Sequence, residues 1–205
     1  MAFEELIGTT DIITFEKVSK PMKTRKIIAV GGSPGTGKTT LFRKYMEDKT
    51  WLEVSPAKLV NASYNTERDL YILGKYEEGE VFAGTDRLGM SCQPNVQEWI
   101  ASHNCNILFE GDRLTNGKFY NFLLSLPNTQ VEFVIITAKS ETLRERYKLR
   151  GSNQSETFLK GRDTKISNIL TNFEFMPYVS EFTNENLEEQ SIIISHIDHF
   201  LNDKN

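Results

Sequence analysis

A glycine-rich stretch, GGSPGTGKTT at residues 31–40, directly follows a run of four apolar residues. Gly32, Gly37, Lys38 and Thr39 fall on the spacing G-x-x-x-x-G-K-[ST]. In this spacing the glycines let backbone N–H groups point inward around nucleotide phosphates, and the lysine adds a positive charge. Thr39 would place its hydroxyl on Mg²⁺, and the helix that begins there directs its positive end at the anion. The stretch therefore predicts a phosphate-binding loop.

We expect this loop to bind ATP together with Mg²⁺, and we expect Lys38 to act in catalysis as well. The loop residues with this predicted role are Gly32, Ser33, Gly35, Thr36, Gly37, Lys38, Thr39 and Thr40.

Such a loop works with a carboxylate at the end of a neighbouring strand, which holds Mg²⁺ or its water. The stretch ILFEGDR supplies Glu110 and Asp112 directly after three large apolar residues. Both are candidate metal ligands, and Glu110 is the first choice because it is closer to the strand. The alternative is that they are ordinary charges at the end of a strand.

Three arginines could neutralise a transferred phosphoryl group. Arg146 and Arg150 are four residues apart, so a helix places them on one face, and Arg162 follows a glycine further along. The guanidinium fork matches phosphate oxygens and stays charged when it loses water. We therefore expect catalytic roles for these three arginines. The alternative is a solvated amphipathic helix with local ion pairs, and we assign Arg144 to that role.

In the loop sequence GTDRLGM, a negatively charged residue, Asp86, and a positively charged residue, Arg87, lie between two glycines. An alcohol acceptor needs a group that orients it and takes its proton, and a carboxylate is the usual choice. Asp86 is the predicted base, with Asp112 as second candidate, and Arg87 is predicted to bind the substrate. The alternative is a local ion pair in a turn, which contributes little.

The pattern of the whole chain predicts the elements that carry these residues. Apolar runs predict strands, and 3.6-residue periodicity predicts helices between them. The segments 57–65 and 69–76 could each be a strand or half of a hairpin. Alternating strands and helices predict an α/β fold of three layers, with a five-stranded, mainly parallel sheet and helices on both faces. We expect an N-terminal extension at 1–24, a single domain at 25–205, and an arginine-rich lid at about 144–166.

The composition is that of an ordinary globular chain, with 39% hydrophobic residues and a net charge of -4. Residues 139–165 nevertheless hold eight basic and four acidic residues, which favours a specific anion site. No apolar run is long enough to span a membrane, and the N-terminus lacks the basic start of a secretory signal. We therefore expect a cytoplasmic location without membrane contact.

The phosphate-binding loop, the strand end EGDR and the stretch RYKLRG…GRDTK together resemble the nucleoside monophosphate kinase superfamily of P-loop enzymes. In those enzymes an acidic-Gly motif at a strand end precedes an arginine. By this resemblance Arg113 is a substrate-binding residue, in contact with the acceptor or with the transition state. The resemblance implies a phosphotransferase that uses ATP and Mg²⁺.

A narrower resemblance is to the kinases of bacteriophage DNA hypermodification, which phosphorylate 5-hydroxymethyluracil already incorporated in DNA. It is carried by LGKYEEGEVFAGTDRLGMSCQPNVQEWI, LFEGDRL and FLKGRDTKISNI. It implies γ-phosphoryl transfer to the 5-hydroxymethyl group, DNA as partner, and the host cytoplasm as location if a phage encodes the chain. Two alternatives stay open: a kinase of free (deoxy)nucleoside monophosphates or another small hydroxyl compound, and a P-loop NTPase switch without kinase activity.

Overall fold

The computed structural model describes residues 23–77, 79–80, 83–151 and 154–203. The expected N-terminal extension, 1–24, therefore lies almost wholly outside the described residues. Within them the strands are β1 (Arg25–Gly31), β2 (Leu52–Ala57), β3 (Val60–Asn65), β4 (Leu70–Leu73), β5 (Asn106–Glu110), β6 (Thr129–Thr137) and β7 (Val179–Thr183). The α-helices are α1 (Lys38–Met46), α2 (Cys92–Ser102), α3 (Gly117–Leu124), α4 (Ser140–Leu149), α5 (Glu156–Leu170) and α6 (Leu187–Asn202). Two 3-10 helices complete the described elements: η1 (Thr85–Arg87) and η2 (Met176–Tyr178).

The seven strands form one mixed sheet in the order β2-β3-β4-β5-β1-β6-β7. From β4 to β7 all neighbouring strands are parallel, whereas β3 is antiparallel to both β2 and β4. The mainly parallel α/β fold is confirmed. The predicted number of five strands is wrong, because two antiparallel strands extend the sheet beyond β4.

Of the two extra strands, β3 lies within the segment 57–65, which was expected to be a strand or half of a hairpin, and β2, apart from its last residue, lies outside every expected strand. β2 is an edge strand with mostly exposed side chains, and it contains Pro56, so it has no continuous apolar face. The chain reverses at Leu59 and Asp69, which take left-handed φ angles of 63° and 48°. Aspartate tolerates this conformation and is common in turns, whereas leucine rarely adopts it, so the turn at Leu59 carries no such signal.

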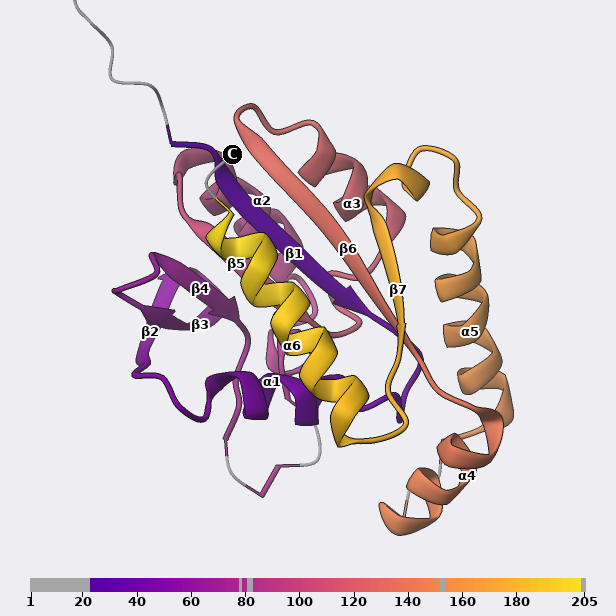
Figure 1. The fold of residues 1–205 in the computed structure, drawn as a ribbon. Coiled ribbons are helices and arrows are strands. Elements are labelled where there is room, and N and C mark those ends of the chain that lie inside the picture. The colour runs from indigo at the N-terminus through magenta and orange to yellow at the C-terminus, as the bar shows by residue number, and fades with distance from the viewer. Residues whose placement is uncertain (1–22, 78, 81–82, 152–153, 204–205) are drawn as a thin grey trace, which may run out of the picture.

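Helices cover both faces of the sheet, which makes three layers (Figure 1). On one face α1 and α6 pack on Ile28 and Val30 of β1. On the other face α2, α3 and α5 pack on Ile27 and Ala29. Successive side chains of a strand point to opposite faces, so β1 is buried on both and lies in the middle of the sheet. Its carboxyl end at Gly31 therefore opens onto the edge where ligands bind in such folds.

None of the helices that the structure describes has the length and apolar composition needed to cross a membrane.

The segment expected to form a lid, 144–166, consists of the end of α4, a connection and the first part of α5. Ser155 caps α5, since its hydroxyl accepts a hydrogen bond from the backbone N–H of Phe158 at 3.2 Å. Ile166 and Ile169 are buried in the core. Because α5 is anchored in this way, the described residues of the segment show no separate lid.

Candidate active site

The phosphate-binding loop connects β1 to α1. Its glycines take φ angles that other residues rarely adopt, 150° at Gly32 and 89° at Gly37. A Cβ atom at Gly32 would lie 2.3 Å from the carbonyl oxygen of Ile136. Lys38 Nζ donates to the carbonyl oxygens of Gly32 at 2.6 Å and Ser33 at 3.0 Å. The path of the loop therefore requires glycine, and the lysine amine lies against the loop's own carbonyls.

Side chains from the carboxyl edge of the sheet hold the outer side of the loop. Arg146 of α4 donates to the carbonyl oxygens of Gly35 at 3.0 Å and Asn184 at 2.8 Å. The side-chain amide of Asn184 donates to the carbonyl oxygen of Thr36 at 2.8 Å. Arg146, predicted to contact the transferred group, therefore bonds to the loop backbone in this structure.

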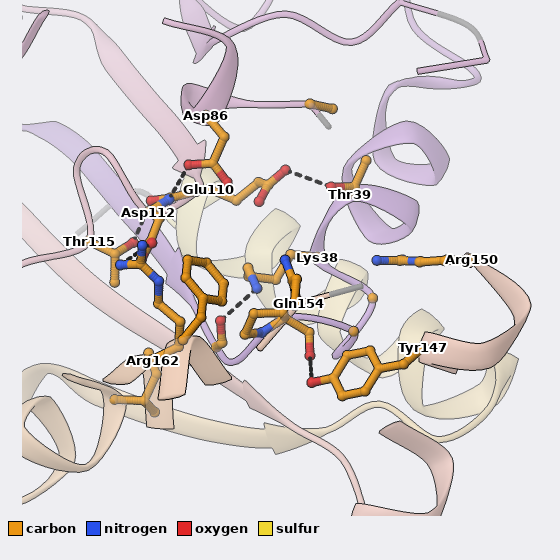
Figure 2. A pocket seen from close by; sticks show the side chains of 18 of the residues that line it. Lys38, Thr39, Asp86, Glu110, Asp112, Thr115, Tyr147, Arg150, Gln154 and Arg162 are labelled. Atoms are coloured by element: carbon orange, nitrogen blue, oxygen red, sulfur yellow. Dashed lines mark hydrogen bonds and ion pairs between the residues drawn. The ribbon is translucent and has the colours of Figure 1, made fainter. Parts of the chain in front are cut away.

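A cavity of ≈ 420 Å³ opens beside the loop, between the end of β5, η1, α4 and α5 (Figure 2). Many of the predicted residues line it: Gly32, Gly35, Gly37, Lys38, Thr39, Asp86, Glu110, Asp112, Arg150 and Arg162. The other predicted residues are not among those that line it: Ser33, Thr36, Thr40, Arg87, Arg113 and Arg146.

Glu110 is the last residue of β5, and the parallel pairing of β5 with β1 sets it beside the start of α1. Its Oε1 accepts a hydrogen bond from the Thr39 hydroxyl at 3.1 Å, and the residue is buried. Burial raises the pKa of Glu110 to about 7; Lys38 opposes this shift and Asp86 adds to it. Burial also lowers the pKa of Lys38. The carboxylate and the loop lysine therefore share one poorly solvated site.

Thr39 and Glu110 fit a Mg²⁺ site. Mg²⁺ is usually held by one or two carboxylates together with waters and substrate phosphates, rather than by a cage of protein ligands. The two side chains supply oxygen donors 3.1 Å apart next to the phosphate-binding loop. The described residues include no group of three or more His, Cys, Asp or Glu side chains that could hold a metal ion. A site shared with nucleotide phosphates agrees with this pattern.

The carboxylates of Asp86 and Asp112 differ in their partners. Asp86 Oδ1 accepts a hydrogen bond from the backbone N–H of Asp112 at 2.7 Å, and Asp86 has no ion-pair partner in the described part of the chain. Asp112 pairs with Arg162, and its Oδ1 lies 2.8 Å from Lys165 Nζ. Two cations from α5 therefore neutralise Asp112, whereas the carboxylate of Asp86 lines the cavity without an ion pair to any described residue.

Helix α5 joins both sides of the cavity. The hydroxyl of Ser33 donates to the carboxylate of Asp163, while Arg162 and Lys165 hold Asp112 at the end of β5. The Arg162 guanidinium also lies over the Phe158 ring, 4.5 Å from its centroid. The helix thus contacts the phosphate-binding loop and the strand end together.

Two arginines that were predicted to bind the substrate, Arg87 and Arg113, are not among the residues that line the cavity. Arg87 pairs with Glu80 and lies 3.6 Å from Glu77, so its ion pairs are with these two glutamates and not with the neighbouring Asp86. Arg113 has a buried Nε without a hydrogen-bond partner among the described residues. Thr40 is exposed on α1. Roles for these three in substrate or cofactor binding stay predictions.

Sequence reasoning missed several residues of the cavity. Tyr147 lines it and donates its hydroxyl to the carbonyl oxygen of Pro34 at 2.8 Å. Phe158, which also lines it, and Lys165, which holds Asp112, come from α5, a helix that we had assigned to a lid. The sequence does contain a signal for helix α5, because serine, here Ser155, is a favoured N-cap residue and apolar residues follow it at helical spacing.

Comparison with known proteins identifies the class. The model of the family described as P-loop Nucleotide Kinase3 matches residues 22–201. The chain therefore belongs to this family, and it is a kinase. No curated protein sequence matches it.

Two solved structures are similar to the chain at low sequence identity. A gluconokinase from Sinorhizobium meliloti 1021 has 15% identity and a TM-score of 0.47, with 85% of this chain and 94% of that chain covered. A sugar kinase from Janibacter sp. HTCC2649 has 14% identity and a TM-score of 0.48, with 86% and 95% covered. At these TM-scores neither likeness carries an argument about the substrate.

The raised pKa of Glu110 predicts a pH-dependent stability. A carboxyl whose folded-state pKa lies above its ordinary value stabilises the fold most when it is protonated, so this contribution is lost as pH rises from about 4.5 to about 7. Glu110→Gln removes the ionisation. Without nucleotide and Mg²⁺, we expect the variant to gain stability relative to the parent between pH 5 and pH 8, by at most about 3 kcal/mol. Urea unfolding across this pH range measures the difference, and a constant difference would contradict the prediction.

Proposed function

We propose that this P-loop kinase uses ATP and Mg²⁺ to phosphorylate a hydroxyl of a small molecule. The observation that carries the proposal is the carboxylate of Asp86, which lines the same cavity as Lys38 and Glu110 and has no counter-ion among the described residues. A hydroxyl acceptor needs such a group, because its proton must leave as the new O–P bond forms. A phosphate acceptor needs no base and would meet this carboxylate as a like charge.

The side chains that line the cavity have different roles in the transfer. Thr39 and Glu110 would hold Mg²⁺, and the bound ion would neutralise charge on the phosphate oxygens. Lys38 would exchange its hydrogen bonds with loop carbonyls for bonds to those oxygens. Arg150, directly after α4, and Arg162 of α5 add guanidinium donors that can stabilise the charge that develops in the transition state.

Asp86 supports the acceptor half of the reaction. The acceptor oxygen attacks the γ-phosphorus, the bond to the β–γ bridging oxygen breaks, and the acceptor proton passes to the Asp86 carboxylate. One oxygen of that carboxylate is held by the backbone N–H of Asp112 at 2.7 Å. The other oxygen is available to orient the hydroxyl, which a general base must reach within hydrogen-bond distance.

The size and charge of the site favour a small acceptor over DNA. The cavity of ≈ 420 Å³ lies in the range of small-molecule sites. Two of the basic residues that could have served nucleic acid are engaged inside the molecule, since Arg146 bonds to the loop backbone and Lys165 pairs with Asp112. The net charge is -4. The narrower expectation of 5-hydroxymethyluracil in DNA receives no support from these observations or from the family match.

An acceptor panel tests the proposal. The protein is incubated with γ-labelled ATP, Mg²⁺ and one of three acceptors: a mixture of nucleosides, sugars and polyols; a mixture of nucleoside monophosphates; or DNA containing 5-hydroxymethyluracil. We expect label on the first mixture. Label only on the monophosphates would refute the hydroxyl acceptor, and label only on the DNA would favour the hypermodification reaction. Release of labelled inorganic phosphate without label on any acceptor would favour an NTPase switch.

A further inference from the structure

Thr85 is a buried polar residue that none of the steps above uses. It lies in η1, directly before Asp86, and it is 0% exposed. Its hydroxyl donates a hydrogen bond to the backbone carbonyl oxygen of Glu110 at 2.9 Å. The side chain therefore ties the short helix that carries Asp86 to the end of the strand that carries Glu110.

The backbone of η1 touches the strand end on both sides of this bond. Gly84 has a φ angle of 67°, and a Cβ atom there would lie 2.6 Å from Glu110 Oε1. Gly111 has a φ angle of 114°, and a Cβ atom there would lie 2.5 Å from Thr85 Oγ1. A Cβ atom at either position would overlap the atoms named, and glycine adopts such φ angles without steric cost. The two glycines thus let the Thr85 hydroxyl sit between Asp86 and the backbone of β5.

We propose that Thr85 is a positioning residue for phosphoryl transfer. Its hydroxyl fixes η1 on the end of β5. It thereby sets the place of the Asp86 carboxylate, which lines the cavity beside Glu110 and Asp112 (Figure 2). The hydrogen bond from the Asp112 backbone to Asp86 Oδ1 is a single contact, about which the side chain could still turn. The Thr85 hydroxyl adds a second tether on the adjacent residue, which holds the backbone from which the Asp86 side chain extends. The inference rests on the proposed role of Asp86 as the base.

Two substitutions separate the hydroxyl from the shape of the side chain. Thr85→Val keeps the branched shape and loses the hydrogen bond, whereas Thr85→Ser keeps the hydroxyl. We expect the valine variant to lose about 10²-fold in kcat, as a small displacement of a catalytic group can cause, while its KM for ATP stays within about twofold. The serine variant should keep a kcat near that of the parent. Thr85→Ala also lacks the hydroxyl and replaces the valine variant if that protein does not fold.

A double-mutant cycle distinguishes positioning from a general structural role. In an Asp86→Asn background, Thr85→Val should cause no further loss of kcat, because no carboxylate remains to be positioned. An equal loss in both backgrounds would overturn the proposal, as would a valine variant with the kcat of the parent or a serine variant as impaired as valine. An Asp86→Asn protein with full activity would instead refute the proposed function, and with it this inference. Loss of activity in Asp86→Asn combined with a normal Thr85→Val refutes the inference alone.

Discussion

An Asp86→Asn protein should lose about 10²–10⁴-fold in kcat for transfer to a hydroxyl, the contribution typical of a positioned general base. Asparagine has nearly the same shape and can still accept the hydrogen bond from the backbone N–H of Asp112. Its amide oxygen, however, does not take up a proton at neutral pH. Because the substitution leaves the phosphate-binding loop intact, KM for ATP should change little. Steady-state kinetics with γ-labelled ATP and a hydroxyl acceptor measure both quantities.

Asp48→Asn is a matched control for this experiment. Asp48 is exposed just after α1 and does not line the cavity, so the same chemical change there should leave kcat at the parent value. An Asp86→Asn protein that phosphorylates a hydroxyl at nearly the parent rate would remove Asp86 from the mechanism.

Lys38→Ala should lower kcat/KM for ATP by about 10²–10³-fold, the effect of deleting one preorganised donor to developing charge. Lys38 lies at the centre of the phosphate-binding loop, with its amine 2.6 Å from the carbonyl oxygen of Gly32. It is therefore placed to bind phosphate oxygens when they enter the loop. Nucleotide titration and labelled transfer give the loss in binding and in turnover separately.

Lys44→Ala supplies the control from the same helix. Lys44 is exposed on α1, and its ion pair within the described part of the chain is with Glu47, at 2.6 Å. Such surface substitutions usually change stability by no more than about 0.5 kcal/mol. Its kinetics should match those of the parent. If Lys38→Ala bound ATP and turned it over as well as Lys44→Ala does, the loop would not be the working phosphate site.

The parts of the site that sequence could predict are local in the chain. The phosphate-binding loop follows from four residues at fixed spacing, and the structure places it between β1 and α1. Glu110 was recognisable because charge follows directly on a buried strand, and it is the last residue of β5. In both cases a short segment contains the apolar element and the polar group that the element positions.

The remaining contacts join residues far apart in the chain, which periodicity does not reveal. Ser33 bonds to Asp163 across 130 positions, and Lys165 bonds to Asp112 across 53. Which cation finds which carboxylate depends on how α5 packs on the sheet. Arginine spacing alone therefore could not show that Arg146 holds the loop backbone while Arg162 pairs with Asp112.

The edge of the sheet escaped prediction for a related reason. Strand β2 joins the sheet by pairing with β3, and none of its residues is fully buried. Such a strand is specified by its partner. A pattern that scores each segment by itself therefore misses β2, although it marks the segment of β3 as a possible strand.

The bond formed to the transferred phosphorus tests the central claim most directly. After incubation with ATP, Mg²⁺ and a mixture of nucleosides, sugars, polyols and nucleoside monophosphates, ³¹P NMR distinguishes a phosphate monoester from a phosphoanhydride. Transfer to a hydroxyl predicts a new monoester signal that the Asp86→Asn protein does not produce. A product that contains only new phosphoanhydride, or inorganic phosphate alone, would contradict the account.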